Sequence, residues 1–96
     1  MQTLAARHEV RIPLSIRVDL YSLDIRRPPQ GAQTENVSTH GARVVASKAW
    51  KPNVRLDVRS RPGDFRARAR VVYCEPKGQG TFAIGLQLIA TAGSWK

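Results

Sequence analysis

Residues 65–73 read FRARARVVY, and this alternation of apolar residues with arginine decides the fold class. Successive side chains of a β-strand point to opposite faces, so the apolar set should face a core and the arginines should face solvent. The same period of two recurs at Ile16–Leu20, Val54–Val58 and Phe82–Leu88. The residues expected to face the core within 65–73 are Phe65, Ala67, Ala69, Val71 and Tyr73.

Two further short strands are expected at Gln33–Val37 and Ala42–Ala46, which brings the number of strands to about six. Turn residues separate the strands, as in the glycine- and proline-rich stretch at 75–80. Parallel strands would need crossover helices, and the chain has no helical periodicity to supply them. The sequence therefore predicts an all-β domain whose antiparallel sheet is closed into a barrel or folded as a sandwich.

The chain has 96 residues, which is the length of one domain. Residues 1–14 carry charge and a proline without sustained alternation, so we expect a flexible N-terminal arm. Residues 15–88 should form the β-domain. Residues 89–96 are too short and too mixed in composition to predict a further element, and we treat them as a C-terminal tail.

The formal net charge is +9, and most of the basic residues are arginine. The planar guanidinium suits bidentate contact with phosphate and with the guanine edge. Such a charge indicates an anionic partner, which could be a nucleotide, nucleic acid, an acidic protein or a membrane surface. A solvated surface that reflects only genome composition would give the same charge.

Other classes of protein have little support in the sequence. No apolar run approaches the roughly 20 residues that span a bilayer, and no secretory signal is recognisable. Cys74 is the only cysteine, so no disulfide framework or zinc cluster is expected. The sequence also lacks the usual signs of an enzyme. It has no nucleophile with a base, no paired carboxylates in a motif and no phosphate-cradling loop before a helix. We expect a cytoplasmic, non-enzymatic protein without a metal or cofactor.

Two short motifs carry the candidate chemistry. Arg7 and Arg11 stand four residues apart in the arm, where both guanidinium groups could converge on one ligand. Asn36 and Ser38 stand two apart, so both side chains would point the same way from an extended segment. Gly41 would then let the backbone turn or approach a ligand closely.

The pairing of RxxxR with a downstream NxSxxG resembles the PilZ domain family, which binds the bacterial second messenger cyclic di-GMP. The resemblance runs from about Arg7 to Leu88, and the strands at 69–73 and 82–88 are similar to the closing strands of that family. It implies a six-stranded antiparallel barrel of split-barrel, Greek-key character. The ligand would lie outside the barrel, between the N-terminal arm and the NxSxxG strand.

The resemblance also implies roles for these residues in signal transduction. Arg7 and Arg11 would grip a guanine edge, a phosphate or a base plane. Asn36 stands where the family often has Asp and would accept from guanine, while Ser38 would add a smaller polar contact and Gly41 would shape the site. Ala6 precedes RxxxR where some members have an extra arginine, which favours a single bound ligand. Binding would order the arm and present a new surface to an unidentified effector protein or fused domain.

Three more residues could lie at the periphery of the ligand: His8, His40 and Arg70. Arg70 belongs to a row with Arg66 and Arg68. This row could be a solvated face, a wall of the site or a second surface for an anionic partner. The main alternative function is a small basic barrel of the OB or cold-shock type that binds RNA or DNA. Such barrels expose aromatic residues for base stacking, whereas only Tyr21 falls clearly outside the core-facing phase here. A member of the family that has lost its ligand and acts as a scaffold is a further possibility.

Overall fold

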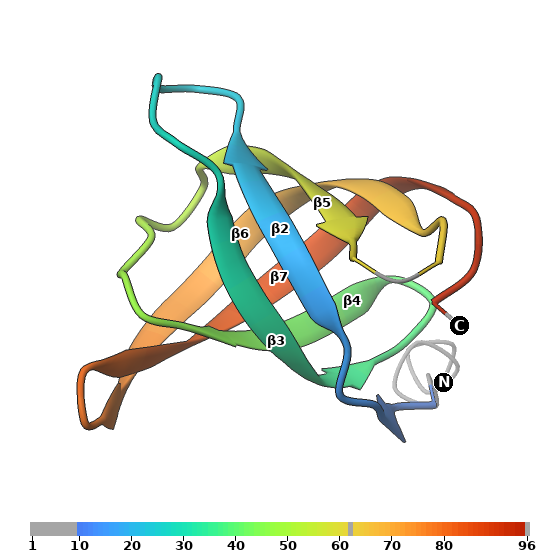
Figure 1. The fold of residues 1–96 in the computed structure, drawn as a ribbon, viewed down its shortest axis with the longest axis horizontal. Helices are drawn as coiled ribbons and strands as arrows, with labels where there is room; N and C mark the ends of the chain where they lie inside the picture. The colour runs from blue at the N-terminus through green and yellow to red at the C-terminus, as the bar shows by residue number, and fades with distance from the viewer. Residues whose placement is uncertain (1–9, 62, 96) are drawn as a thin grey trace, which may run out of the picture.

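The computed structural model describes residues 10–61 and 63–95, and within these ranges every regular element is a β-strand. Figure 1 shows the strands wrapped around one core. Their bounds are β1 Ile12–Pro13, β2 Arg17–Ser22, β3 Gln30–Val37, β4 Gly41–Ala46, β5 Arg55–Ser60, β6 Arg66–Gly78 and β7 Thr81–Ala92.

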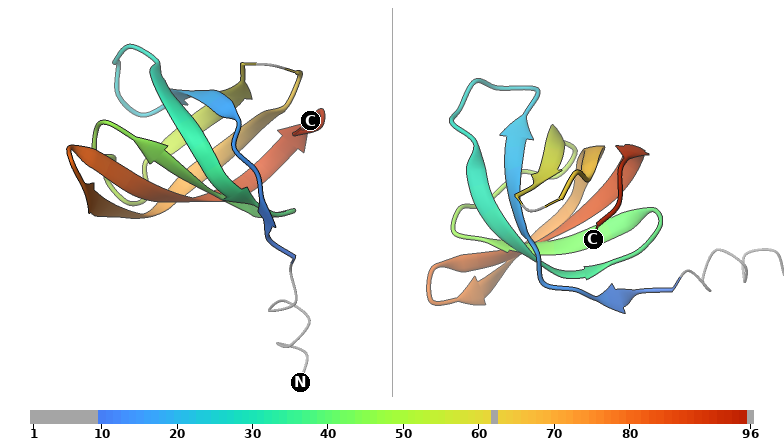
Figure 2. Two further views of the ribbon diagram at one scale, coloured as in Figure 1. Left: turned by 60° about the horizontal axis from the view of Figure 1, so that its bottom comes forward. Right: turned by 45° about the vertical axis from the view of Figure 1, so that its right-hand side comes forward.

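All the pairings are antiparallel, and the strand order is β1-β3-β2-β5-β6-β7-β4. A further pairing of β3 with β4 closes the sheet, so six strands form a barrel and β1 is an extra strand at the end of β3. The two views in Figure 2 show this closure from other sides. The prediction of an all-β, six-stranded antiparallel barrel is confirmed.

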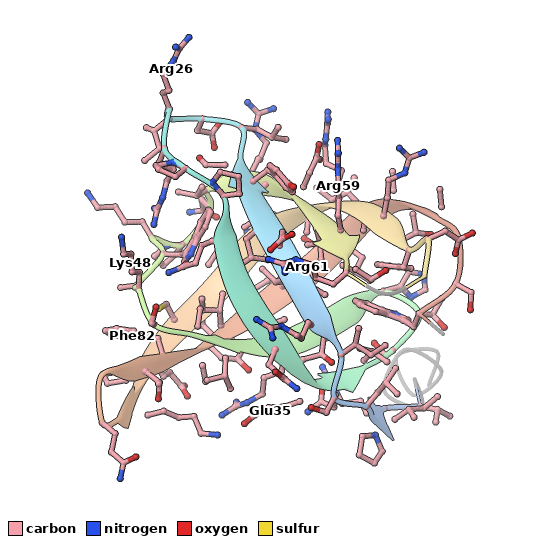
Figure 3. The ribbon with its side chains drawn as sticks, in the orientation of Figure 1. Arg26, Glu35, Lys48, Arg59, Arg61 and Phe82 are labelled. Atoms are coloured by element: carbon pink, nitrogen blue, oxygen red, sulfur yellow. The ribbon has the colours of Figure 1, made fainter. Side chains whose placement is uncertain are left out.

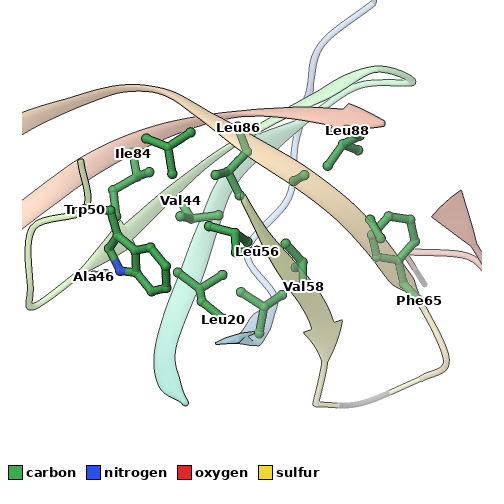
Figure 4. Packing of buried hydrophobic residues seen from close by; sticks show 14 residues of the cluster. Leu20, Val44, Ala46, Trp50, Leu56, Val58, Phe65, Ile84, Leu86 and Leu88 are labelled. Carbon is green, nitrogen blue, oxygen red and sulfur yellow. The ribbon is translucent and has the colours of Figure 1, made fainter. Parts of the chain in front are cut away.

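The core is built from the predicted alternation. Val18 and Leu20 of β2, Leu56 and Val58 of β5, and Ile84 of β7 are almost completely buried. In Figure 4, Leu20, Leu56 and Ile84 converge around Val44 of β4, and the same cluster includes residues of β6. Trp50 closes one end of the core and donates from Nε1 to Oε1 of Gln30 at 2.5 Å. At the other end Trp95 stacks on Phe65, with 3.8 Å between the ring centroids.

The expectation that Tyr73 faces the core is wrong. A β-bulge lies between Val71 and Tyr73, because Val71 pairs with Leu86 while Tyr73 pairs with the adjacent Gly85. The extra residue, Val72, is exposed, and Cys74 packs against the core in place of Tyr73. A bulge shifts the phase of every later side chain by one residue, and counting by two along the sequence cannot detect it.

The strands also extend further than expected at two places. β7 continues to Ala92, so the boundary expected at Leu88 falls inside a strand; residues 90–92 pair with Arg66–Arg68 of the long β6. Within the arm, Ile12 and Pro13 form β1 by pairing with the end of β3. In both places the strand is defined by its partner, not by an alternating pattern of its own.

A two-residue turn joins the long strands β6 and β7. Gly78 pairs with Thr81, and the residues between them, Gln79 and Gly80, have φ angles of 56° and 76°. Two consecutive left-handed residues are the signature of a type I′ turn, whose twist matches that of the flanking strands. No helix in the described part of the chain is long and apolar enough to cross a membrane.

Candidate ligand-binding site

The two sequence motifs meet along β3. Ile12 pairs with Val37 and Pro13 pairs with Asn36, so β1 runs antiparallel to the end of the strand that carries NxSxxG. The N–H of Leu14 donates to the carbonyl of Glu35 at 3.3 Å. This pairing brings Arg11 to the same side of the barrel as Asn36. Arg7 and His8, the other predicted site residues of the arm, lie outside the described residues.

Arg11 and Asn36 are in direct contact. Nη1 of Arg11 donates to Oδ1 of Asn36 at 2.9 Å, at an exposed position. This bond uses one of the five N–H donors of the guanidinium, and the amide group of Asn36 keeps its own two donors. The pair therefore presents several donors to solvent, which is suitable chemistry for phosphate oxygens and for guanine acceptors.

Ser38 and Gly41 shape the turn that joins β3 to β4. The N–H of Ser38 donates to the carbonyl of Gly41 at 2.8 Å, and the buried Ser38 hydroxyl also points to this carbonyl, at 3.3 Å. A Cβ on Gly41 would lie only 3.2 Å from the backbone oxygen of Leu86. In this structure both residues therefore fix the loop, and the glycine lets the turn lie close to β7.

A second β-bulge leaves a carboxylate on the same outer face as this pair. Thr34 pairs with Val44 and Asn36 pairs with Arg43, which leaves Glu35 as the extra residue of β3. Glu35 accepts from Nε of Arg43 at 2.8 Å and from the ammonium of Lys77. The hydrogen bond from Lys77, followed by that from Arg43, lowers the pKa of Glu35 below its ordinary value. Figure 3 shows Glu35 at the outer surface beside β3.

Arg43 is held from its other side by Tyr73. Nη1 of Arg43 donates to the Tyr73 hydroxyl at 2.9 Å. The Tyr73 ring lies against the backbone of Gly85, where a Cβ would come within 2.1 Å of the ring. Pro13, Asn36, Arg43, Gly85 and Tyr73 are successive pairing partners and form one row across five strands.

Sequence reasoning did not find the cluster formed by Glu35, Arg43, Tyr73 and Lys77. These residues come from three separate strands, and two bulges decide which of them face outward. The only local signal was the pair of adjacent polar residues Glu35 and Asn36, which strict alternation cannot accommodate on one face.

The two remaining peripheral residues lie on the neighbouring row. His40 is exposed in the turn after Ser38, and its carbonyl accepts from the N–H of Leu88 at 2.9 Å. Arg70 donates to Oε1 of Gln87 from Nη2 at 2.8 Å. Gln87 pairs with Gly41, so two strand spacings, or about 10 Å, separate Arg70 from the turn.

The charge around the site favours an anion. Among its described residues, Arg11, Arg43 and Lys77 supply three positive charges, and Glu35 supplies one negative charge. The described part of the chain contains no group of three or more His, Cys, Asp or Glu side chains that could hold a metal ion.

This chain is similar both to a known protein family and to solved structures. The model of the PilZ domain family matches residues 5–92. Among solved structures, the crystal structure of the PilZ domain of CeSA from a cellulose-synthesizing bacterium superposes with a TM-score of 0.60 at 23% identity. The match covers 84% of this chain and 82% of that one, and at this identity it bears on the fold alone. The curated proteins gave no match.

Proposed function

The chain belongs to the PilZ domain family, and from this premise we propose that it is a receptor for cyclic di-GMP. PilZ domains are known for binding this nucleotide and serve as binding or adaptor domains rather than enzymes. We assign the ligand contacts to Arg7, Arg11, Asn36 and Ser38, with Gly41 shaping the turn and His8, His40 and Arg70 at the periphery. The observation that carries the proposal is the contact of Arg11 with Asn36, because it joins the two motifs at one place.

The proposed relay uses the segment before β2. Ligand contacts to Arg7 and Arg11 order the arm beyond its existing pairing through β1, and the ordered arm with its ligand forms a surface for an effector protein or a fused domain. The ordering cost must be offset by the charge-assisted contacts to the ligand. Amide hydrogen exchange across residues 3–14 tests this step. Exchange should slow when cyclic di-GMP is added, and equal rates with and without it would contradict the relay.

Isothermal titration with cyclic di-GMP tests the site itself. Arg11→Ala and Asn36→Ala should each weaken binding by about tenfold or more, since hydrogen bonds to charged groups contribute roughly 1.5–3 kcal/mol. Arg26→Ala is the matched control, because Arg26 is exposed in the loop between β2 and β3, away from β1 (Figure 3). The stoichiometry should be one ligand per chain. Equal affinities of the Arg11 and Arg26 variants for cyclic di-GMP would contradict the proposed site.

The alternative of an RNA- or DNA-binding barrel is tested in the same titration with GTP and a short RNA as competing ligands. Tyr73 is outward-facing, but its ring lies against Gly85 and its hydroxyl accepts from Arg43, so both ends of the side chain are already engaged within the barrel. Tight RNA binding together with no signal from cyclic di-GMP would favour the alternative.

A further inference from the structure

Arginines are placed directly opposite one another on the outer face of β5 and β6. Arg59 pairs with Arg66, and Arg55 pairs with Arg70. Like charges at directly opposed positions of a sheet destabilise it. Only the pair between them, Asp57 with Arg68, joins opposite charges, at 3.0 Å. Asp24 forms an ion pair with Arg55 at 3.0 Å, so the unrelieved repulsion lies mainly between Arg59 and Arg66, and that end of the surface is suited to an anionic partner.

The Arg59–Arg66 pair borders a shallow hollow of about 340 Å³ that continues onto the end of β7. Arg59 leans away over the ring of Tyr21, 5.0 Å from its centroid, and projects from the barrel in Figure 3. The side chain of Arg66 is exposed, and its guanidinium has no hydrogen bond or ion pair within residues 10–61 and 63–95. Its whole guanidinium is therefore available to a partner.

The end of β7 beside this hollow is a free sheet edge. β4 pairs with β7 only as far as Gly41 with Gln87, whereas β6 continues to pair with β7 up to Arg66 with Ala92. Along the described chain, residues 89–92 therefore have a strand on one side only (Figure 2). Ile89, Ala90, Thr91 and Ala92 are all exposed.

We propose that this edge binds an extended acidic segment of a partner protein as an added β-strand. Backbone N–H and C=O groups of 89–92 would pair with the segment, as in other cases of strand addition. Its outward side chains at positions i and i+2 would lie beside Ala92 and Ala90, in line with Arg66 and Arg68. The short alanine side chains leave the space above them open, so a glutamate can reach across β7 to an arginine about 10 Å away.

Other occupants fit this surface less well. A second copy of the chain would bring two molecules of net charge +9 together. A nucleic acid strand could contact the arginines, but it cannot use the backbone edge, and Asp57 interrupts the row of positive charge. The combination of an open edge with arginines one strand behind it favours alternating carboxylates on a polypeptide.

A peptide of alternating threonine and glutamate is the probe, and a peptide of the same composition with contiguous glutamates is its control. The alternating peptide should bind the full chain more tightly and should slow amide exchange at residues 89–92. Arg66→Gln should weaken its binding by about fivefold. Arg26→Gln, an equal change of charge at a distant exposed position, should leave its affinity unchanged.

Four results would overturn the proposal. Equal weakening by Arg66→Gln and Arg26→Gln would reduce the interaction to net charge. Unchanged exchange at 89–92, or no binding of the alternating peptide, would remove the added strand. Binding of a short single-stranded RNA that depends on Arg66, without peptide binding, would assign the surface to nucleic acid. The unfolding curve of the Arg66→Gln protein shows whether this variant is folded.

Discussion

Gly85 is the residue on which the outer row of the barrel depends. The Tyr73 ring lies on its backbone, and this position lets the Tyr73 hydroxyl reach Arg43. Asn36 is the pairing partner of Arg43, so the row ends at the proposed ligand site. The small size of one glycine therefore positions two side chains on the strands that flank β7.

Replacing Gly85 by alanine should lower the free energy of unfolding by about 1–3 kcal/mol, as is usual for overpacking. The reason is the 2.1 Å separation between the added Cβ and Cε2 of Tyr73. Urea unfolding measures the effect. In a Tyr73→Ala background the same change should be almost neutral, because the colliding ring is gone. Gly31→Ala is the control, since its nearest neighbour is 4.0 Å away; an equal loss there would contradict the explanation.

For single residues, the sequence predicted which residues belong to the candidate site better than it predicted where their side chains point. Arg11, Asn36, Ser38 and Gly41 could be selected from the motif and its spacing, and the structure brings Arg11 to Asn36 and Ser38 to Gly41. The direction of the Ser38 hydroxyl toward the Gly41 carbonyl was not predictable. It depends on how tightly the turn packs against β7, which no local pattern records.

Among the elements, β3 is fastened to its neighbours by Glu35. This carboxylate joins β3 to Arg43 of β4 and to Lys77 near the tip of β6. The bulge lets Glu35 and Asn36 face outward together, because an unbulged strand would direct these two neighbours to opposite faces. The stability of the β3–β4 closure should therefore depend on the charge of one side chain.

Glu35→Gln should lower the free energy of unfolding at neutral pH by about 0.5–1 kcal/mol. The pKa of Glu35 is lowered in the folded protein, so its contribution is present above the ordinary value of 4.5 and is lost as the pH falls through the lowered pKa. The difference between wild type and variant should thus shrink in acid. Urea unfolding between about pH 7 and pH 3 measures it. Glu75→Gln is the control, and a difference of the same pH dependence there would contradict the role of Glu35.

The strands with strict alternation, such as β2 and β5, were predictable because one face of each is buried. The three register shifts in β6–β7 were not, because a bulge is fixed by the partner strand and by barrel curvature. β1 was not predictable either, because a strand of two residues, one of them proline, is too short to show an alternating pattern.

For the whole molecule, the dominant long-range force is the repulsion of a net charge of +9. Five ion pairs are found in the described ranges, with N–O distances of 3.0 Å or less. Contacts this short are screened little by salt, whereas repulsions across the barrel act over distances comparable to the Debye length. Added salt should therefore weaken the long-range repulsion more than it weakens the ion pairs.

Raising NaCl from about 0.01 M to about 0.1 M should increase the free energy of unfolding, because the Debye length falls from roughly 30 Å to roughly 10 Å. Urea unfolding at the two concentrations measures it. Arg26→Gln/Lys48→Gln removes two exposed charges and should reduce the increase. A loss of stability with added salt would mean that the ion pairs outweigh the net charge.

The two-residue turn at Gln79 and Gly80 has a consequence for the order in which the barrel assembles. Its ends are adjacent in sequence, so zipping β6 to β7 requires little loop-closure entropy, and a hairpin forms within microseconds. Closing the ring requires β4 to pair with β7, which joins residues 41–46 to residues 82–87, and a contact between segments so far apart along the chain must come late. The hairpin is therefore the natural nucleus, and the bulges that aim Tyr73 outward are already in place when the remaining strands arrive.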